Sequence, residues 1–122
     1  GIGLIASYYI IVFTKTYNTN IKILVRTFII LLFIWHGILK YSIWNGIRYY
    51  DDGNFIKSIP HLERAVKIHP KKIGKFHSLL GMMYFELNDL EKASFYTKKA
   101  IQINPNYNSP KELLKLIQNS SN

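Results

Sequence analysis

The side chains that could perform catalysis or bind a metal are few and scattered along this sequence. Neither the histidines nor the serines show the spacing that metal coordination or nucleophilic catalysis requires. For example, His69 and His77 fall at different helical phases across a predicted loop. The side chains concerned are His36, His61, His69, His77, Ser78 and Ser94. The absence of cysteine excludes disulfides, thiol catalysis and cysteine-based zinc sites.

The carboxylates have a structural explanation. Asp51 and Asp52 belong to the segment "DDGN", and Asp89 belongs to "ND"; both segments are typical of turns that lead into a helix N-cap. Glu86 and Glu91 flank the second turn, where acidic side chains cap and solvate a helix end. The sequence has no phosphate-binding loop, dinucleotide fingerprint or zinc pattern. We therefore expect no enzymatic activity, no cofactor and no metal.

Positive charge is in excess but dispersed. The 122 residues carry a formal net charge of +9, and the first acidic residue is Asp51. Nucleic-acid-binding proteins usually concentrate Lys and Arg among aromatic residues, and no such run occurs here. The basic residues are better explained as solvated helix faces and membrane-flanking charges, so we expect no nucleic acid partner.

The segment "IKILVRTFIILLFIWHGILKYSIW" is the most apolar part of the chain. No formal charge lies between Arg26 and Lys40. A helix over residues 22–40 would be about 28 Å long, close to the hydrocarbon thickness of a bilayer. Tyr41 and Trp44 follow where interfacial aromatics are usually found. The segment predicts a transmembrane helix. The alternative, a buried helix that caps a soluble domain, is disfavoured because apolar residues occupy every face.

A second apolar run, "GIGLIASYYIIVF", covers residues 1–13 and is too short to span a bilayer alone. We favour a two-helix membrane hairpin in which residues 14–22 form the tight connection. A secretory signal is the competing interpretation, although a basic leader and a small-residue cleavage site are lacking. We expect an integral protein of a bacterial inner membrane or an organellar membrane. Its orientation stays open, because basic residues flank both ends of the longer helix.

The remainder of the sequence contains an internal repeat. Small, aromatic or apolar residues recur in "NGIRYYDDGNFIKSIPHLERAVKIHP" and "LGMMYFELNDLEKASFYTKKAIQINP" at a constant separation of 35 residues. The matched pairs are Gly46 with Gly81, Tyr49 with Tyr84, Phe55 with Leu90, Ser58 with Ala93, Ala65 with Ala100, Ile68 with Ile103, and Pro70 with Pro105. So many coincidences at one offset are difficult to obtain by chance.

Each copy is expected to be a helix–turn–helix unit. Gly46 and Gly81 lie inside helical sequence, where glycine is about 1 kcal/mol less favourable than alanine. We therefore expect another helix to approach closely at both glycines, with small residues on the second helix of each copy as the opposing surface. Pro70 and Pro105 end the second helices.

This pattern resembles the tetratricopeptide repeat, a unit of about 34 residues that forms two antiparallel helices. The matching residues are Leu80, Gly81, Tyr84, Ala93, Ala100 and Pro105 in the second copy, and Gly46, Tyr49, Ala65 and Pro70 in the first. Asn45, Ser58 and Thr97 depart from the family, which usually has leucine, alanine and an aromatic residue there. One extra residue lies in the linker around residues 71–73. The resemblance covers roughly residues 39–106.

The segment "NSPKELLKLIQN" after Pro105 predicts a further helix that covers the exposed end of the repeat stack. Two repeats are fewer than the three normally needed for independent stability. The other end of the stack is therefore expected to pack against another protein or against the membrane helix. We expect the membrane helix to continue into the first repeat helix near residues 40–44.

We therefore expect an all-α protein with an N-terminal transmembrane helix, two tetratricopeptide repeats and a C-terminal capping helix. The membrane-anchoring region is expected at 1–40, with helices at about 1–14 and 22–40. The repeats are expected at 41–107, and the capping helix and tail at 108–122.

The resemblance implies that a protein partner binds in a concave groove lined by the first helix of each copy. The implied groove residues are Ile43, Ile47, Tyr50 and Asp51 in the first copy, and Lys75, Ser78, Leu79, Met82, Phe85 and Glu86 in the second. Family members that clamp a carboxylate use Lys and Asn where this sequence has Ile43, Ile47 and Leu79, so that activity is not expected. The groove instead suits an apolar or amphipathic segment, with Met82 and Phe85 as anchors. Alternatively, some of these side chains pack against the membrane helix or the terminal helix.

Three functions are compatible with this organisation. The first is a membrane-anchored adaptor or scaffold that recruits or assembles proteins at a bilayer. The second is a structural subunit of a large membrane complex, with its repeats buried against neighbouring subunits. The third is the C-terminal part of a multi-pass membrane enzyme whose catalytic residues lie upstream of Gly1. We favour the adaptor.

Overall fold

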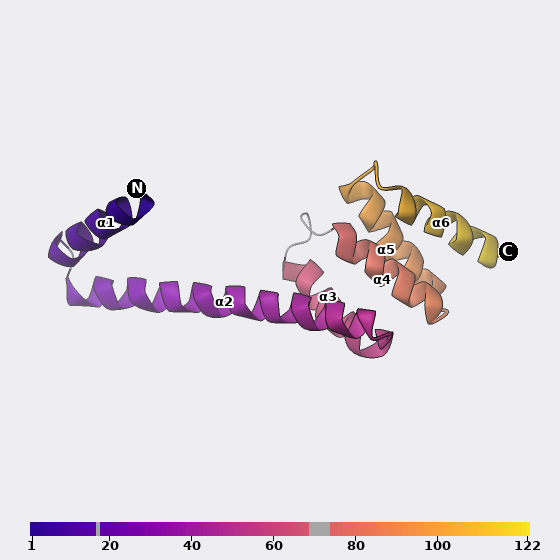
Figure 1. The fold of residues 1–122 in the computed structure, drawn as a ribbon, viewed down its shortest axis with the longest axis horizontal. Helices are drawn as coiled ribbons and strands as arrows, with labels where there is room; N and C mark the ends of the chain where they lie inside the picture. The colour runs from indigo at the N-terminus through magenta and orange to yellow at the C-terminus, as the bar shows by residue number, and fades with distance from the viewer. Residues whose placement is uncertain (17, 69–73) are drawn as a thin grey trace. The chain divides into compact units, whose positions relative to one another are not determined.

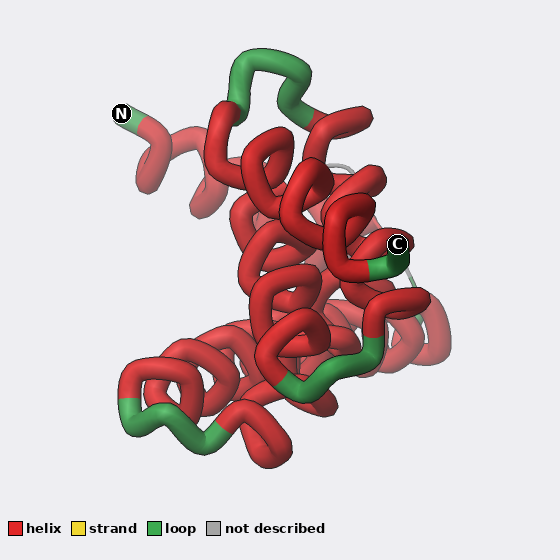
Figure 2. The backbone as a smooth tube through the Cα atoms, turned by 90° about the vertical axis from the view of Figure 1, so that its right-hand side faces the viewer, coloured by secondary structure: helices red, strands yellow, loops and turns green. Residues whose placement is uncertain are grey.

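The computed structural model describes residues 1–16, 18–68 and 74–122, and within these ranges the chain forms six α-helices and no strand (Figures 1 and 2). The helices are α1 (Ile2–Thr16), α2 (Thr19–Asp51), α3 (Phe55–Ile68), α4 (Gly74–Glu86), α5 (Leu90–Ile103) and α6 (Asn108–Ser120). The predicted all-α fold, in which a long apolar helix precedes helical repeats, is confirmed. His69, Pro70 and the predicted linker at 71–73 lie outside the described residues.

Contacts divide the chain into two compact units, residues 1–38 and 39–122, and helix α2 contributes to both. Helix α2 runs without interruption through residues 40–44, where the apolar helix was expected to meet the first repeat helix. Its beginning is capped by Asn18, whose Oδ1 accepts a hydrogen bond of 3.0 Å from the Ile21 backbone N–H. Helical structure extends to Thr16 on one side and starts again at Thr19, so the connection is shorter than the predicted 14–22.

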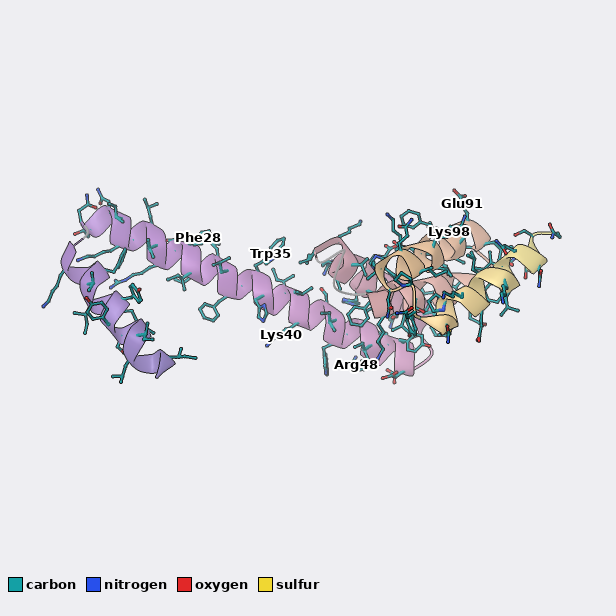
Figure 3. The ribbon with its side chains drawn as sticks, turned by 90° about the horizontal axis from the view of Figure 1, so that it is seen from above. Phe28, Trp35, Lys40, Arg48, Glu91 and Lys98 are labelled. Atoms are coloured by element: carbon teal, nitrogen blue, oxygen red, sulfur yellow. The ribbon has the colours of Figure 1, made fainter. Side chains whose placement is uncertain are left out.

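Within the described part of the chain, α2 is the one helix long and apolar enough to cross a membrane. None of the residues in its apolar 18-residue window is buried. Phe28 is 61% exposed and Trp35 is 56% exposed, and Figure 3 shows both side chains extending outward from the helix. Contiguous exposed apolar surface of this extent is typical of sites that meet a membrane or another protein.

Helix α1 is apolar over Ile2–Phe13 but is shorter than α2. Most of its side chains are exposed. A mostly apolar cavity of about 640 Å³ lies between α1 and the beginning of α2, within the first unit. It is lined by Tyr9, Ile10, Val12, Phe13, Val25, Arg26 and Ile29. That the two helices form a membrane hairpin stays a prediction.

The same turn closes both helical pairs of the second unit. Gly53 in the first pair and Asn88 in the second adopt positive φ angles of 72° and 62°. The next residue in each pair, Asn54 or Asp89, donates its backbone N–H to a carbonyl at the end of the preceding helix, at 2.8 and 2.9 Å. These bonds satisfy carbonyls that the helix end would otherwise leave without a partner. Equivalent residues are 35 positions apart, so the sequence repeat is also a structural repeat.

The residue that ends each turn also caps the helix that follows it. Asn54 Oδ1 accepts a hydrogen bond of 3.2 Å from the Lys57 N–H, and Asp89 Oδ1 accepts one of 3.1 Å from the Lys92 N–H. A side-chain oxygen at this position pairs with a backbone N–H that has no acceptor within the helix. The predicted turns and N-caps are therefore confirmed.

The two repeat glycines mark the places where helices approach closely. A Cβ atom on Gly46 would lie 2.5 Å from Cδ2 of Leu62, and one on Gly81 would collide with the Thr97 side chain. The Ser58 hydroxyl donates a hydrogen bond of 2.7 Å to the Gly46 carbonyl. The close approach predicted at both glycines is confirmed, and in each copy it joins the first helix to the second. The nearest side chains are Leu62 and Thr97, so the expectation that only small residues form the opposing surface is wrong at Gly46.

Apolar side chains of the second unit form one core cluster. Its buried members are Leu39, Ile59, Leu62, Ala65, Val66, Phe76, Leu80, Met83, Tyr84, Ala93, Leu113 and Ile117. Helix α6 packs against α5 and α4 and buries Pro110, Leu113 and Ile117. The C-terminal helix thus covers the apolar surface that the last repeat helix would otherwise expose, as a capping helix does.

Candidate protein-binding surface

The groove residues implied for the first copy lie on α2, and some of them also serve packing. Ile43 and Tyr50 are half-buried and pack against the core cluster. The Tyr50 ring stacks on Phe55 of α3, with centroids 5.7 Å apart and an interplanar angle of 28°. Burial raises the pKa of Tyr50, because taking the hydroxyl out of water disfavours the phenolate. Ile47 and Asp51 are exposed.

The groove residues implied for the second copy lie on α4 and differ in accessibility. Lys75 and Glu86 are exposed, whereas Ser78 is only 6% exposed. Three of them, Leu79, Met82 and Phe85, are half-buried and pack against the core cluster. Half-buried apolar side chains are held in place by their buried atoms and leave the remaining atoms available for a partner.

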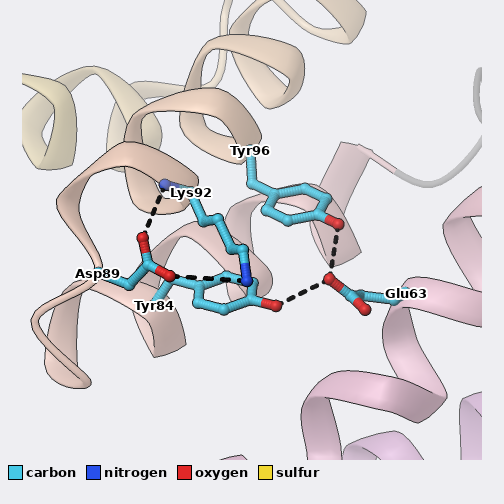
Figure 4. A network of polar contacts seen from close by, with 5 residues as sticks. All are labelled: Glu63, Tyr84, Asp89, Lys92 and Tyr96. Carbon is cyan, nitrogen blue, oxygen red and sulfur yellow. Dashed lines mark hydrogen bonds and ion pairs between the residues drawn. The ribbon is translucent and has the colours of Figure 1, made fainter.

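A polar network joins the two copies (Figure 4). Glu63 of α3 accepts hydrogen bonds at Oε1 from the Tyr84 hydroxyl of α4, at 2.8 Å, and from the Tyr96 hydroxyl of α5, at 2.9 Å. The two tyrosine rings stack with centroids 5.7 Å apart and an interplanar angle of 2°. Burial, followed by the hydrogen bond to Glu63, raises the pKa of both tyrosines, because each effect favours the neutral phenol.

Lys92 and Asp89 continue this network at the surface. The Lys92 Nζ lies 5.0 Å from the centroid of the Tyr84 ring and 3.7 Å from Oδ2 of Asp89. Solvent screens an exposed ion pair of this kind, so its contribution to stability is small. The hydrogen bonds from Tyr84 and Tyr96 to Glu63 therefore do more to hold α4 and α5 against α3 than the ion pair does.

A second groove, of about 710 Å³, lies between α3, α4 and α5. It is lined by Val66, Lys67, His77, Phe95, Tyr96, Lys99, Gln102 and Ile103. None of the groove residues implied by the family resemblance lines it. Its walls come from three helices, and the resemblance assigned only the faces of first helices, so the sequence carried no signal for it.

Two of the described histidines, His61 and His77, pack against aromatic rings. His61 stacks on Tyr49 with centroids 5.8 Å apart and meets Tyr41 edge-on at 6.2 Å. His77 is 5% exposed, and its ring centroid lies 6.2 Å from that of Tyr96. In the ranges that the structure describes, no group of three or more His, Cys, Asp or Glu side chains could hold a metal ion.

Comparison with known proteins identifies the second copy. No curated protein matches the chain. The family model of the tetratricopeptide repeat matches residues 74–107, which contain α4 and α5. The first copy lies outside this match, although its turn and its glycine contact repeat those of the second. The second helical pair, within residues 74–107, therefore matches the tetratricopeptide repeat, as the sequence predicted for that copy.

Proposed function

We propose that the protein is a membrane-anchored adaptor that binds a segment of another protein and holds it at a bilayer. The tetratricopeptide repeat supports a role in protein–protein interaction. One observation carries the membrane part of the proposal: the apolar stretch of α2 is uncovered, and the same helix continues into the first helical pair.

The α4 surface supports binding of an apolar or amphipathic segment. Met82 and Phe85 present partly exposed apolar surface on one helix, and the charged Lys75 and Glu86 lie on the same helix, exposed to solvent. An amphipathic helix or an extended apolar peptide buries its apolar side chains against anchors of this type, while charged residues at the edge favour one orientation.

Affinity purification of the full chain in mild detergent tests the binding surface. We expect Met82→Glu or Phe85→Glu to abolish capture of the partner, because each places a charge where an apolar contact is buried on binding. Leu116→Glu is the matched control, because Leu116 is a 53% exposed apolar residue of α6 outside the predicted groove. The groove assignment fails if both α4 variants retain the proteins that the parent captures.

The same purification separates the adaptor from a structural subunit of a large complex. An adaptor yields a folded, monodisperse species once its partner is removed. A structural subunit comigrates with a large assembly and is unstable when expressed alone.

Extraction of membranes tests the anchor. We expect the chain to stay with membranes in alkaline carbonate and to be released by detergent. Replacing Leu31 and Ile34 by arginine should release it, because arginine at the centre of a spanning helix is unfavourable by about 2.5–3.5 kcal/mol per residue. Lys98→Arg serves as the control for expression, since Lys98 is exposed on α5. Recovery of the parent chain in the aqueous fraction without detergent contradicts the anchor.

A further inference from the structure

The end of α2 has a largely exposed face. Tyr41, Trp44 and Arg48 follow at helical spacings of three and four residues, so they share one face. Tyr41 is 61% exposed and Trp44 is 60% exposed, and Arg48 is also exposed. Ser42 and Gly46, on the opposite face, are buried. The exposed face therefore combines aromatic rings with a positive charge.

The cations of this region are held against aromatic rings. The Arg48 Cζ lies 5.1 Å from the centroid of the Trp44 ring and 5.1 Å from that of Tyr49. The Lys57 Nζ, from α3, lies 5.8 Å from the Tyr49 centroid. We call Trp44, Arg48, Tyr49 and Lys57 the basic–aromatic face. Contacts with ring faces are worth about 0.5–1 kcal/mol each at exposed sites, enough to favour one position of the guanidinium.

In this arrangement the side-chain N–H groups of Arg48 and Lys57 stay available to donate hydrogen bonds to a ligand. Within the part of the chain that the structure describes, no hydrogen bond or ion pair engages the side chain of Arg48 or Lys57. Asp51 and Asp52 lie about one turn beyond Arg48 and make no ion pair with it. A guanidinium that lies over aromatic rings can still present its N–H groups at its edges, in the geometry that binds phosphate oxygens in pairs.

The basic–aromatic face follows the apolar stretch in the sequence of α2. This position favours lipid headgroups as the phosphate groups that the face binds. Trp44 follows Lys40, the end of the predicted span, by four residues, which is about 6 Å of helix and falls within a headgroup layer about 5–8 Å thick. Side chains in a helix tilt toward its N-terminus, and the Arg48 guanidinium lies over Trp44, one turn nearer the apolar stretch. Tryptophan and tyrosine prefer this interfacial depth.

We propose that the basic–aromatic face binds the phosphate groups of anionic lipids at the bilayer surface. This inference rests on the membrane anchoring of the proposed function and adds a lipid specificity to it. Arg48 and Lys57 supply the charge, and Trp44 and Tyr49 hold the guanidinium in place between the headgroups. A soluble acidic protein would neutralise the same charges, but it would not respond to lipid composition.

The two tryptophans allow the anchor and the face to be tested separately in the full chain. Trp35→Phe leaves Trp44 to report on the basic–aromatic face, and Trp44→Phe leaves Trp35 to report on the apolar stretch. The first variant is reconstituted in phosphatidylcholine vesicles that contain phosphatidylglycerol brominated near its headgroup. Bromine quenches a nearby indole, so the quenching of Trp44 measures the local share of phosphatidylglycerol relative to its bulk share.

We expect phosphatidylglycerol to be enriched around Trp44 by about fivefold for each basic residue that engages it. Arg48→Gln and Lys57→Gln, each made in the Trp35→Phe background, should each lower this enrichment. Lys99→Gln removes a charge from an exposed lysine that lies over the Phe95 ring, and it should leave the enrichment unchanged. The same measurement with brominated phosphatidylcholine in phosphatidylglycerol should show depletion around Trp44.

The outcomes distinguish the two proposals. Bromines at the chain ends of the lipid should quench Trp35 in the Trp44→Phe variant if α2 spans the bilayer. If Trp35 is quenched but Trp44 shows no enrichment, or if enrichment persists in the Arg48→Gln and Lys57→Gln variants, the lipid site is wrong and the anchor stands. If Trp35 is not quenched, both proposals are wrong.

Discussion

The Tyr96 phenol in α5 donates a hydrogen bond of 2.9 Å to the Glu63 carboxylate in α3, 33 residues earlier in the chain. Glu63 accepts a second hydrogen bond from Tyr84 in α4, so one carboxylate of the first helical pair connects to both helices of the second. Only two helical pairs stack on one another, so they share little apolar surface. A charged acceptor shared by two donors adds to the stability that packing provides.

Removal of this acceptor should destabilise the second unit. We expect Glu63→Ala to lower the free energy of unfolding by about 2–3 kcal/mol, because hydrogen bonds to charged groups are lost and two partly buried hydroxyls are left without their acceptor. Thermal unfolding in mild detergent, followed by circular dichroism, measures the change. Glu63→Gln keeps an acceptor oxygen and should lose less. Equal unfolding midpoints for Glu63→Ala and the parent would show that the network is dispensable.

Alkaline pH should weaken the same contact. The folded state raises the pKa of Tyr84 and of Tyr96 above the usual value of 10.0, so folding favours the neutral phenols. Their stabilising contribution is fully present below about pH 10 and is lost as the pH rises through the folded-state values. We expect the unfolding midpoint of the parent to fall above about pH 10 more steeply than that of a Tyr84→Phe, Tyr96→Phe double variant. Parallel pH profiles would contradict this explanation.

The glycine contacts predict that a glycine-to-alanine substitution changes stability differently at two positions. Gly81→Ala should destabilise the repeat by about 1–3 kcal/mol, because its Cβ meets the Thr97 side chain and lies 3.2 Å from the Thr97 backbone nitrogen. Gly37→Ala should leave the unfolding midpoint unchanged, because nothing lies within 4 Å of its Cβ and Gly37 lies outside the second unit. Adding Thr97→Ala to Gly81→Ala should restore part of the loss. Thermal unfolding of the four proteins tests this order.

The N-cap of α5 provides a further test. Asp89→Ala should lower stability by about 1 kcal/mol, because the Lys92 backbone N–H loses its acceptor at the helix start. Asp89→Asn keeps that acceptor and removes only the charge, which forms an exposed ion pair with the Lys92 side chain. We therefore expect chemical denaturation to place the asparagine variant close to the parent. A loss of equal size in both variants would mean that the charge matters more than the cap.

The sequence by itself determined that two helical pairs recur and where the turn within each pair lies. The turns ending in Asn54 and Asp89 and the constant separation between Gly46 and Gly81 are local features, and the structure confirms them. They could be predicted because capping, positive φ angles and close helix approach each restrict the residue types at one position. The groove residues on α2 and α4 stay a prediction from family resemblance.

Only the tertiary structure decided which side chains of different helices meet. Nothing in the sequence paired Glu63 with Tyr84 and Tyr96, and nothing placed Lys57 of α3 and Arg48 of α2 over the same Tyr49 ring. Periodicity shows which face of a helix is buried but not which neighbour covers it. These contacts depend on the angle and separation between helices, which the packing of the whole core sets.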